Sequence, residues 1–193
     1  TLSSTPTAGQ QALVFGTYCG NSGCGGGNAA SITATLANGA GDSCTVHPSA
    51  PWSINQGSAG DAKLYAWFCP NISANTTYTM TTSTTSWYPT LYVSIWSGVA
   101  TSSFWDVGGS TATTSTVTSM SASAGTTTNA TALIVGFIIL NAANAVTPGS
   151  GFTEIGEDAT AAEQEAKSVA ATGEQPCSWT FASAAGGGAG WVA

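Results

Sequence analysis

The chain has 193 residues, only 6% of them charged, and two basic residues against nine acidic ones give a net charge of −7. Nucleic-acid binding depends on clustered lysine and arginine, so a chain with Lys63, Lys167 and no arginine is not expected to bind nucleic acid. The same shortage argues against anionic membrane surfaces, and the longest apolar run, residues 132–140, is too short for a membrane-spanning helix.

The predicted elements are short β-strands separated by stretches rich in Gly, Pro, Asn and Ser. In chain order they cover residues 13–18, 32–36, 64–69, 78–80, 91–96, 113–119, 133–140, 152–155 and 177–181. Residues 133–140 are apolar on both faces and predict a central strand, whereas the polar run 113–119 predicts an edge strand. The pattern predicts one domain, residues 1–193, folded as an antiparallel β-sandwich, immunoglobulin-like or jelly-roll, of about nine to ten short strands.

The five cysteines indicate an oxidising compartment. Metal-site spacing of the C-x2-C type is absent, and the single histidine cannot complete a Cys2His2 site. We expect one disulfide between Cys19 and Cys24, across a small loop, and another between Cys44 and Cys69 in neighbouring strands. Cys177 is then left over, either buried or intermolecular. With the polar opening Thr1–Ser4, which is not a signal peptide, this indicates an extracellular or cell-surface chain in a mature or excised form.

Catalytic motifs are weak. His47 lies near Asp42 and Ser43 in sequence, but no G-x-S-x-G motif is present to place a nucleophile. We therefore interpret His47 as a loop histidine beside Pro48, and we expect no enzymatic activity.

The acidic residues gather late in the chain. Glu154, Glu157 and Asp158 are candidate calcium ligands together with backbone oxygens, although the regular D-x-D-x-D ladder is missing. The alternative is a solvated acidic face. No other metal or cofactor is expected.

Aromatic residues in predicted loops are the candidate ligand-binding groups. Trp52, Trp87, Tyr88 and Trp105 would form flat apolar platforms suited to sugars or to a protein surface. The alternative is that they plug the ends of the sandwich. Separately, three sequons are candidate N-glycosylation sites, which would help an uncharged surface stay soluble: Asn71, Asn75 and Asn129.

A series of landmarks spans almost the whole chain. They are Thr7–Gln10, Ser31–Thr33, Gly41–Ser43, Tyr65–Trp67, Asn71–Ser73, Tyr88–Pro89, Leu91–Gly98, Gly151–Thr153 and Trp191. Their order resembles the Ser/Thr/Gly-rich immunoglobulin-like β-sandwich module of large secreted bacterial surface proteins. The resemblance implies a module without a shared catalytic site, found in adhesive or surface proteins and sometimes beside carbohydrate-active domains.

The resemblance bears on two segments. Residues 161–171 contain strong helix formers and an i,i+4 pair, Glu163 and Lys167, but the resemblance favours a strand with both residues on one face. Such modules also carry one more leading strand than residues 1–6 provide. We expect an open sheet edge, with residues 1–10 as an extended segment exchanged between subunits. The alternative is that residues 1–6 fold back on their own sheet.

Three classes of function follow from these observations. The first is a structural module that self-associates through sheet edges in a filament, stalk or surface layer, with copies of itself or adjacent modules as partners. The second is a carbohydrate-binding or adhesive module that uses the loop aromatics on a polysaccharide. An enzyme is the third and least expected class.

Overall fold

The computed structural model describes residue 2 and residues 4–20, 32–54, 62–75, 77–123, 125–158 and 162–193. This part of the chain contains strands and no helix, so it holds no helix that could cross a membrane. The strands are β1 (Gln10–Cys19), β2 (Ala34–Asn38), β3 (Thr45–Val46), β4 (Trp52–Ile54), β5 (Ala62–Ile72), β6 (Tyr78–Thr82), β7 (Trp87–Trp96), β8 (Gly108–Ala122), β9 (Thr126–Thr127), β10 (Ala132–Leu140), β11 (Val146–Pro148), β12 (Thr153–Asp158), β13 (Ala162–Val169), β14 (Gly173–Glu174) and β15 (Cys177–Val192). The predicted all-β class is confirmed. More strands occur than the nine or ten expected, because two- and three-residue strands such as β3 and β9 carry too little pattern to be recognised.

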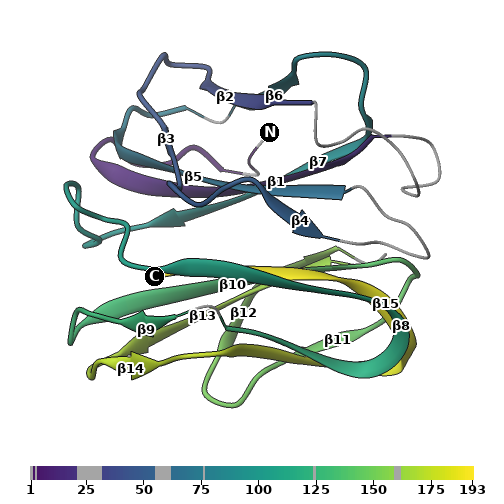
Figure 1. The fold of residues 1–193 in the computed structure, drawn as a ribbon. Coiled ribbons are helices and arrows are strands. Elements are labelled where there is room, and N and C mark those ends of the chain that lie inside the picture. The colour runs from purple at the N-terminus through teal and green to yellow at the C-terminus, as the bar shows by residue number, and fades with distance from the viewer. Residues whose placement is uncertain are drawn as a thin grey trace.

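The N-terminal half forms the upper sheet in Figure 1. β1 lies between β5 and β7 and pairs antiparallel with both, while β3 and β4 pair with the far side of β5. The separate β2–β6 pair covers the outer face of this sheet. Buried side chains such as Trp67 and Tyr78 fill the space between them. Residues alternate between the two faces of each strand, so one sheet contributes to two cores.

The C-terminal half forms the lower sheet, in the order β8–β15–β10–β13–β12, with β11 also on β15. The prediction that residues 133–140 form a central strand is confirmed, and so is the strand interpretation of residues 161–171. The polar strand β8 lies at an edge, as predicted. β8 and β15 bend together at register shifts near Ala185, so the sheet curves around a core of its own.

The two sheets share a core. Phe15 of β1 and Phe137 of β10 stack with ring centroids 5.4 Å apart, and both side chains are fully buried. A polar bridge joins the sheets beside them, since Gln164 of β13 donates a hydrogen bond to Ser94 of β7 at 3.0 Å. Ser94 is buried and also donates to the Leu13 carbonyl, so the bridge is satisfied on the β7 side.

The last strand is longer than the predicted residues 177–181. β15 continues to Val192 through the glycine-rich segment 186–190. Because glycine has no side chain, this strand can approach the upper sheet closely. A Cβ built on Gly188 would lie 2.4 Å from Ile54 Cβ, and one on Gly190 would lie 2.3 Å from Leu64 Cδ2. The glycines are therefore a packing surface, whereas a sequence pattern treats glycine as a strand breaker.

The disulfide predicted between Cys44 and Cys69 is present, with Cα atoms 4.1 Å apart. It follows from the register, because Thr45 of β3 lies opposite Phe68 of β5 and the two cysteines come next to that pair. The predicted partner of Cys19 is Cys24, which lies outside the described residues. Cys177 is a free, buried thiol, one of the two alternatives expected.

The N-terminal segment does not create the open edge that the sequence predicts. β1 has a strand on each side from its first residues, Gln10 and Gln11. Before it, Pro6 is buried and Leu2 packs against the outer cluster of the upper sheet. In this single chain the segment folds back on its own sheet. Among the described residues, the edges of the upper sheet are β7 and the short strands β3 and β4, and those of the lower sheet are β8, β12 and the short strand β11.

Candidate functional site

The four candidate aromatic residues separate into two pairs. Trp52 and Trp87 are strand residues, not the loop residues that were predicted, because each begins a strand that pairs with the upper sheet. Trp52 is only 9% exposed and Trp105 is half-buried, whereas Trp87 and Tyr88 are 45% and 62% exposed. Only the second pair offers an accessible aromatic surface.

His47 holds the first pair in place. Its ring centroid lies 5.0 Å from that of Trp52 and 4.8 Å from that of Trp105, and the side chain is buried. Nδ1 accepts a hydrogen bond from the Ser49 amide at 3.1 Å. Burial lowers the pKa of His47, so its ring is neutral near pH 7. Within the described residues, His47 is a packing centre between two indoles, a role that its loop position does not reveal.

Asp42, the acidic neighbour of His47 in sequence, has a different role. Both of its carboxylate oxygens accept hydrogen bonds from Ser73, one from the amide at 2.7 Å and one from the hydroxyl at 2.8 Å. Asp42 thereby fixes the loop after β5 and is not the partner of the histidine.

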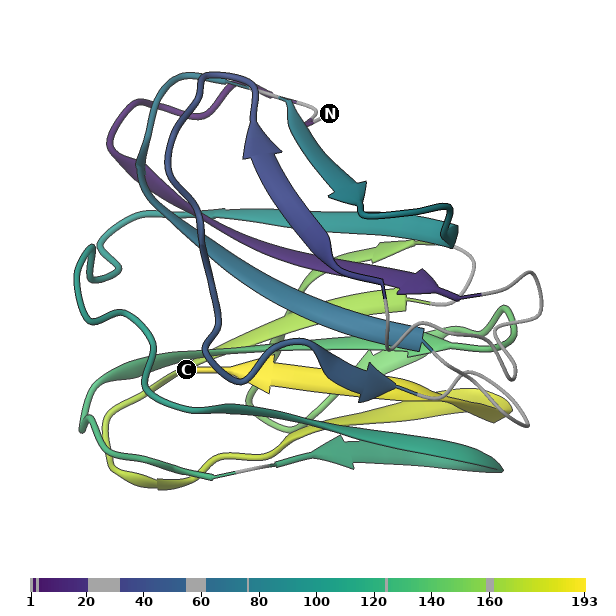
Figure 2. The same ribbon diagram turned by 45° about the horizontal axis from the view of Figure 1, so that its top comes forward.

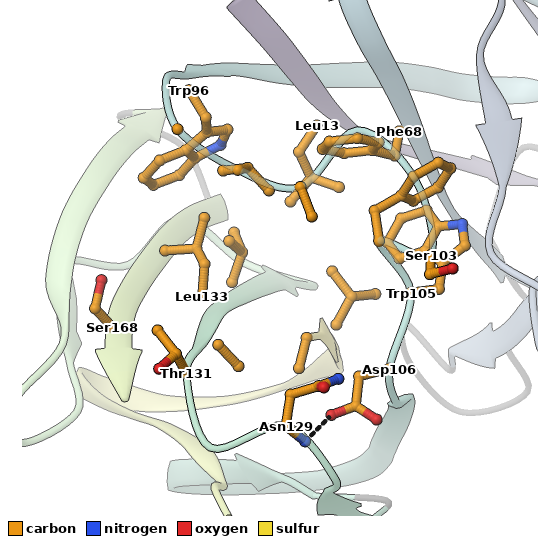
Figure 3. Close-up of a pocket in the computed structure, with 18 of the residues that line it drawn as sticks. Leu13, Phe68, Trp96, Ser103, Trp105, Asp106, Asn129, Thr131, Leu133 and Ser168 are labelled. Atoms are coloured by element: carbon orange, nitrogen blue, oxygen red, sulfur yellow. Dashed lines mark hydrogen bonds between the residues drawn. The ribbon is translucent and has the colours of Figure 1, made fainter. Parts of the chain in front are cut away.

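A cavity of about 460 Å³ opens at one end of the sandwich, shown in Figure 3. Its roof is the loop between β7 and β8, residues 97–107, which lies at the same end as the C-terminus in Figure 2. Its apolar walls come from both sheets and include Leu13, Phe68, Trp96, Val99, Phe104 and Leu133. The mouth carries hydroxyl and amide groups, and the described residues of the lining include no lysine.

Asp106 braces the mouth of the cavity. Its carboxylate accepts hydrogen bonds from the amide and hydroxyl of Thr128, at 2.7 and 2.5 Å, and from the Asn129 amide at 3.1 Å. Burial raises the pKa of Asp106, but these hydrogen bonds outweigh it and hold the pKa below its ordinary value. The Asp106 amide also donates to the Ala193 carbonyl at 2.8 Å. The mouth therefore carries a fixed negative charge.

A second polar cluster lies inside the curved lower sheet. Glu165 is fully buried and accepts hydrogen bonds from the amides of Gly149, at 2.8 Å, and Ser178, at 3.2 Å. Burial raises its pKa to about 7 against the opposing effect of those bonds. The neighbouring Cys177 thiol stays protonated, because burial and the charge of Glu165 raise its pKa well above the usual value. Glu163, on the same face of β13, is also fully buried. The two glutamates therefore share one face of β13, and this face points into the protein and not to solvent.

The outer edge of β7 is the remaining candidate. β7 contains no charged residue, and its pairing with β1 runs without a shift from Trp96 to Thr90. The other two longer edge strands carry features that discourage strand addition: β12 has the exposed carboxylate of Glu154, and the pairing of β8 with β15 is interrupted by two register shifts. Tyr88 also has a left-handed backbone, with φ of 51°, which is uncommon for an aromatic residue.

The predicted calcium and glycan sites have mixed support. Glu154 is exposed on β12, and the side chains of Glu157 and Asp158 lie outside the described part of the structure. No group of three possible metal ligands occurs among the residues that are described. Asn71 and Asn129 are exposed. The Asn75 side-chain amide donates to Asn38 Oδ1 at 3.1 Å and to the Thr77 carbonyl at 2.8 Å, so a glycan, which replaces one Nδ2 hydrogen, would remove at least one of these bonds.

Comparison with known proteins gives no further guidance. No family model, curated protein or solved structure matches the chain.

Proposed function

We propose that this chain is an extracellular, non-catalytic structural module that self-associates through the outer edge of β7, as a subunit of a filament, stalk or surface layer. The observation that carries the proposal is the uncharged edge of β7, with Trp87 and Tyr88 exposed at its start. A sheet edge without charges is a template for strand addition. The Cys44–Cys69 disulfide supports an oxidising location.

A second copy is the partner that fits this edge. Two antiparallel β7 strands related by a two-fold axis place the same residues opposite each other, so one surface serves both subunits. Pro89 has no amide hydrogen to donate, which limits regular pairing to residues 90–96. Because β7 contains no charged residue, no like charges within the paired strands oppose the contact, although the chain carries a net charge of −7.

Tyr88→Lys is expected to weaken self-association at least about tenfold, because Tyr88 adjoins the paired residues 90–96, and the substitution removes an exposed aromatic ring and places a charge at the end of the contact. Val46→Lys is the matched control: Val46 is 39% exposed on β3, at the opposite edge of the same sheet, and the change in charge is similar. Sedimentation equilibrium measures both. Equal association of the two variants, or a monomeric wild type, would contradict the proposal.

Carbohydrate binding is the alternative, and it depends on the same exposed pair. Trp52 and Trp105 pack against His47, so of the four candidate aromatic residues only Trp87 and Tyr88 are exposed enough to stack on a sugar. Retention of a monomeric wild type on insoluble polysaccharide, lost on Trp87→Ala, would favour this function over assembly.

A further inference from the structure

The cavity beneath the β7–β8 loop has the size and lining of a small-molecule site. Its volume of about 460 Å³ lies within the range usual for such sites. Protein interiors are otherwise close-packed, and space lined by apolar groups does not hold water well. Leu13 and Phe68 from the upper sheet face Leu133 from the lower one across it, as Figure 3 shows.

The cavity is built from fixed parts. The Trp96 indole donates to Ser94 at 2.9 Å, and Ser94 is the residue that bridges the two sheets. The Phe104 ring lies 4.4 Å from that of Phe68, which ties the roof to the upper sheet. At the other end of the roof, the Asp106 amide bonds to Ala193. These contacts hold the walls apart whether or not a ligand is present.

The lining also selects the chemistry of the ligand. No lysine occurs among the described residues of the lining, and Asp106 gives the mouth a negative charge. An anionic ligand would therefore be repelled by Asp106, and no cationic side chain of the lining would offset that repulsion. A sugar would bring several hydroxyls to walls that cannot bond them, which is costly. The three hydrogen bonds that Asp106 accepts already hold the loop in place.

We propose that this cavity binds an uncharged, largely apolar small molecule, whose body lies between Trp96, Phe104 and Leu133 and whose polar end faces the hydroxyl groups at the mouth. The cavity shares Trp96 with the end of β7, but all of its walls come from one chain, so its formation does not require self-association.

Two fluorescent probes with the same ring system test the proposal. Neutral N-phenyl-1-naphthylamine is expected to bind saturably, one molecule per chain, and to quench tryptophan emission. Its anionic relative, 8-anilinonaphthalene-1-sulfonate, is expected to bind at least about tenfold more weakly because of the charge at the mouth. Equal affinities, or no saturable binding of the neutral probe, would overturn the proposal.

Filling the cavity gives the site-specific test. Val99→Trp is expected to weaken binding of the neutral probe at least about tenfold, whereas Val46→Trp, the same change on exposed β3, leaves it unchanged. Ala100→Phe fills the same space from an exposed position and replaces the first variant if that one does not fold. Unchanged binding in a folded cavity variant, or competition by free hexoses, contradicts the inference. The Tyr88→Lys variant should bind the neutral probe as tightly as the wild type does, which distinguishes failure of this proposal from failure of the proposed self-association.

Discussion

Gly188→Ala is expected to destabilise the fold by about 3 kcal/mol, the upper part of the usual range for overpacking a core. The added methyl group would lie 2.4 Å from Ile54 Cβ and 3.2 Å from Ile54 Cα. These atoms belong to or adjoin the backbone of β4 and cannot rotate away. The lower sheet must therefore move from the upper one at this point, which opens the core beside it.

Gly156→Ala is the matched control for that change. Gly156 is also a strand glycine with an ordinary backbone, but it lies on β12, and no described atom outside its chain neighbours lies within 4 Å of the place that the added methyl group would take. Chemical denaturation of both variants measures the difference. A cost below about 1 kcal/mol for Gly188→Ala would show that the sheets are not in close contact there.

Glu165 is expected to stabilise the wild-type protein by about 2–3 kcal/mol more near pH 5 than near pH 8. His47, whose pKa burial lowers, acts in the opposite direction. The pKa of Glu165 rises from the ordinary 4.5 to about 7 on folding, so the folded chain binds the proton more tightly than the unfolded chain. Protonation therefore stabilises the fold, and this contribution is lost as the pH rises through about 7. The side chain that contacts Glu165 is the Cys177 thiol, and Glu163 and Lys167 also act electrostatically on that thiol.

Glu165→Gln isolates this contribution, because the amide keeps an acceptor for one backbone amide and cannot ionise. In this variant, the unfolding free energy at pH 5 minus that at pH 8 should be about 2–3 kcal/mol lower than in the wild type. Glu174→Gln removes one charge from an exposed position on β14, in a separate two-stranded sheet, and should leave the difference as in the wild type. An unaltered pH dependence in Glu165→Gln would contradict the assigned burial.

The sequence predicts the fold class because alternation and turn residues are local signals. Residues 133–140 are recognisable as a central strand by their apolar character on both faces, and Cys44 and Cys69 can be paired by their places in neighbouring strands. The full length of β15 is not predictable in this way. Its glycines allow close packing against Ile54 and Leu64, and both of these residues are far away in sequence.

The candidate sites are harder to predict for the same reason. The cavity is formed where the ends of β1, β5, β7, β10 and β15 meet, and no single segment carries its signature. Trp105 stands out in the sequence as an aromatic of interest, but its contact with His47 depends on the loop after β7 reaching the loop before β4. Hydrophobic patterns also predict charged faces to be exposed, so the inward direction of Glu165 cannot be foreseen.

Hydrogen exchange of the β7 amides, measured at a low and a high protein concentration, tests the proposed assembly most directly. If β7 is the contact between copies, amides within residues 90–96 become more protected as the concentration rises, while those of the edge strands β8 and β12 stay unchanged. Exchange of β7 that is the same at both concentrations, in samples that sedimentation shows to be associated, would contradict the account.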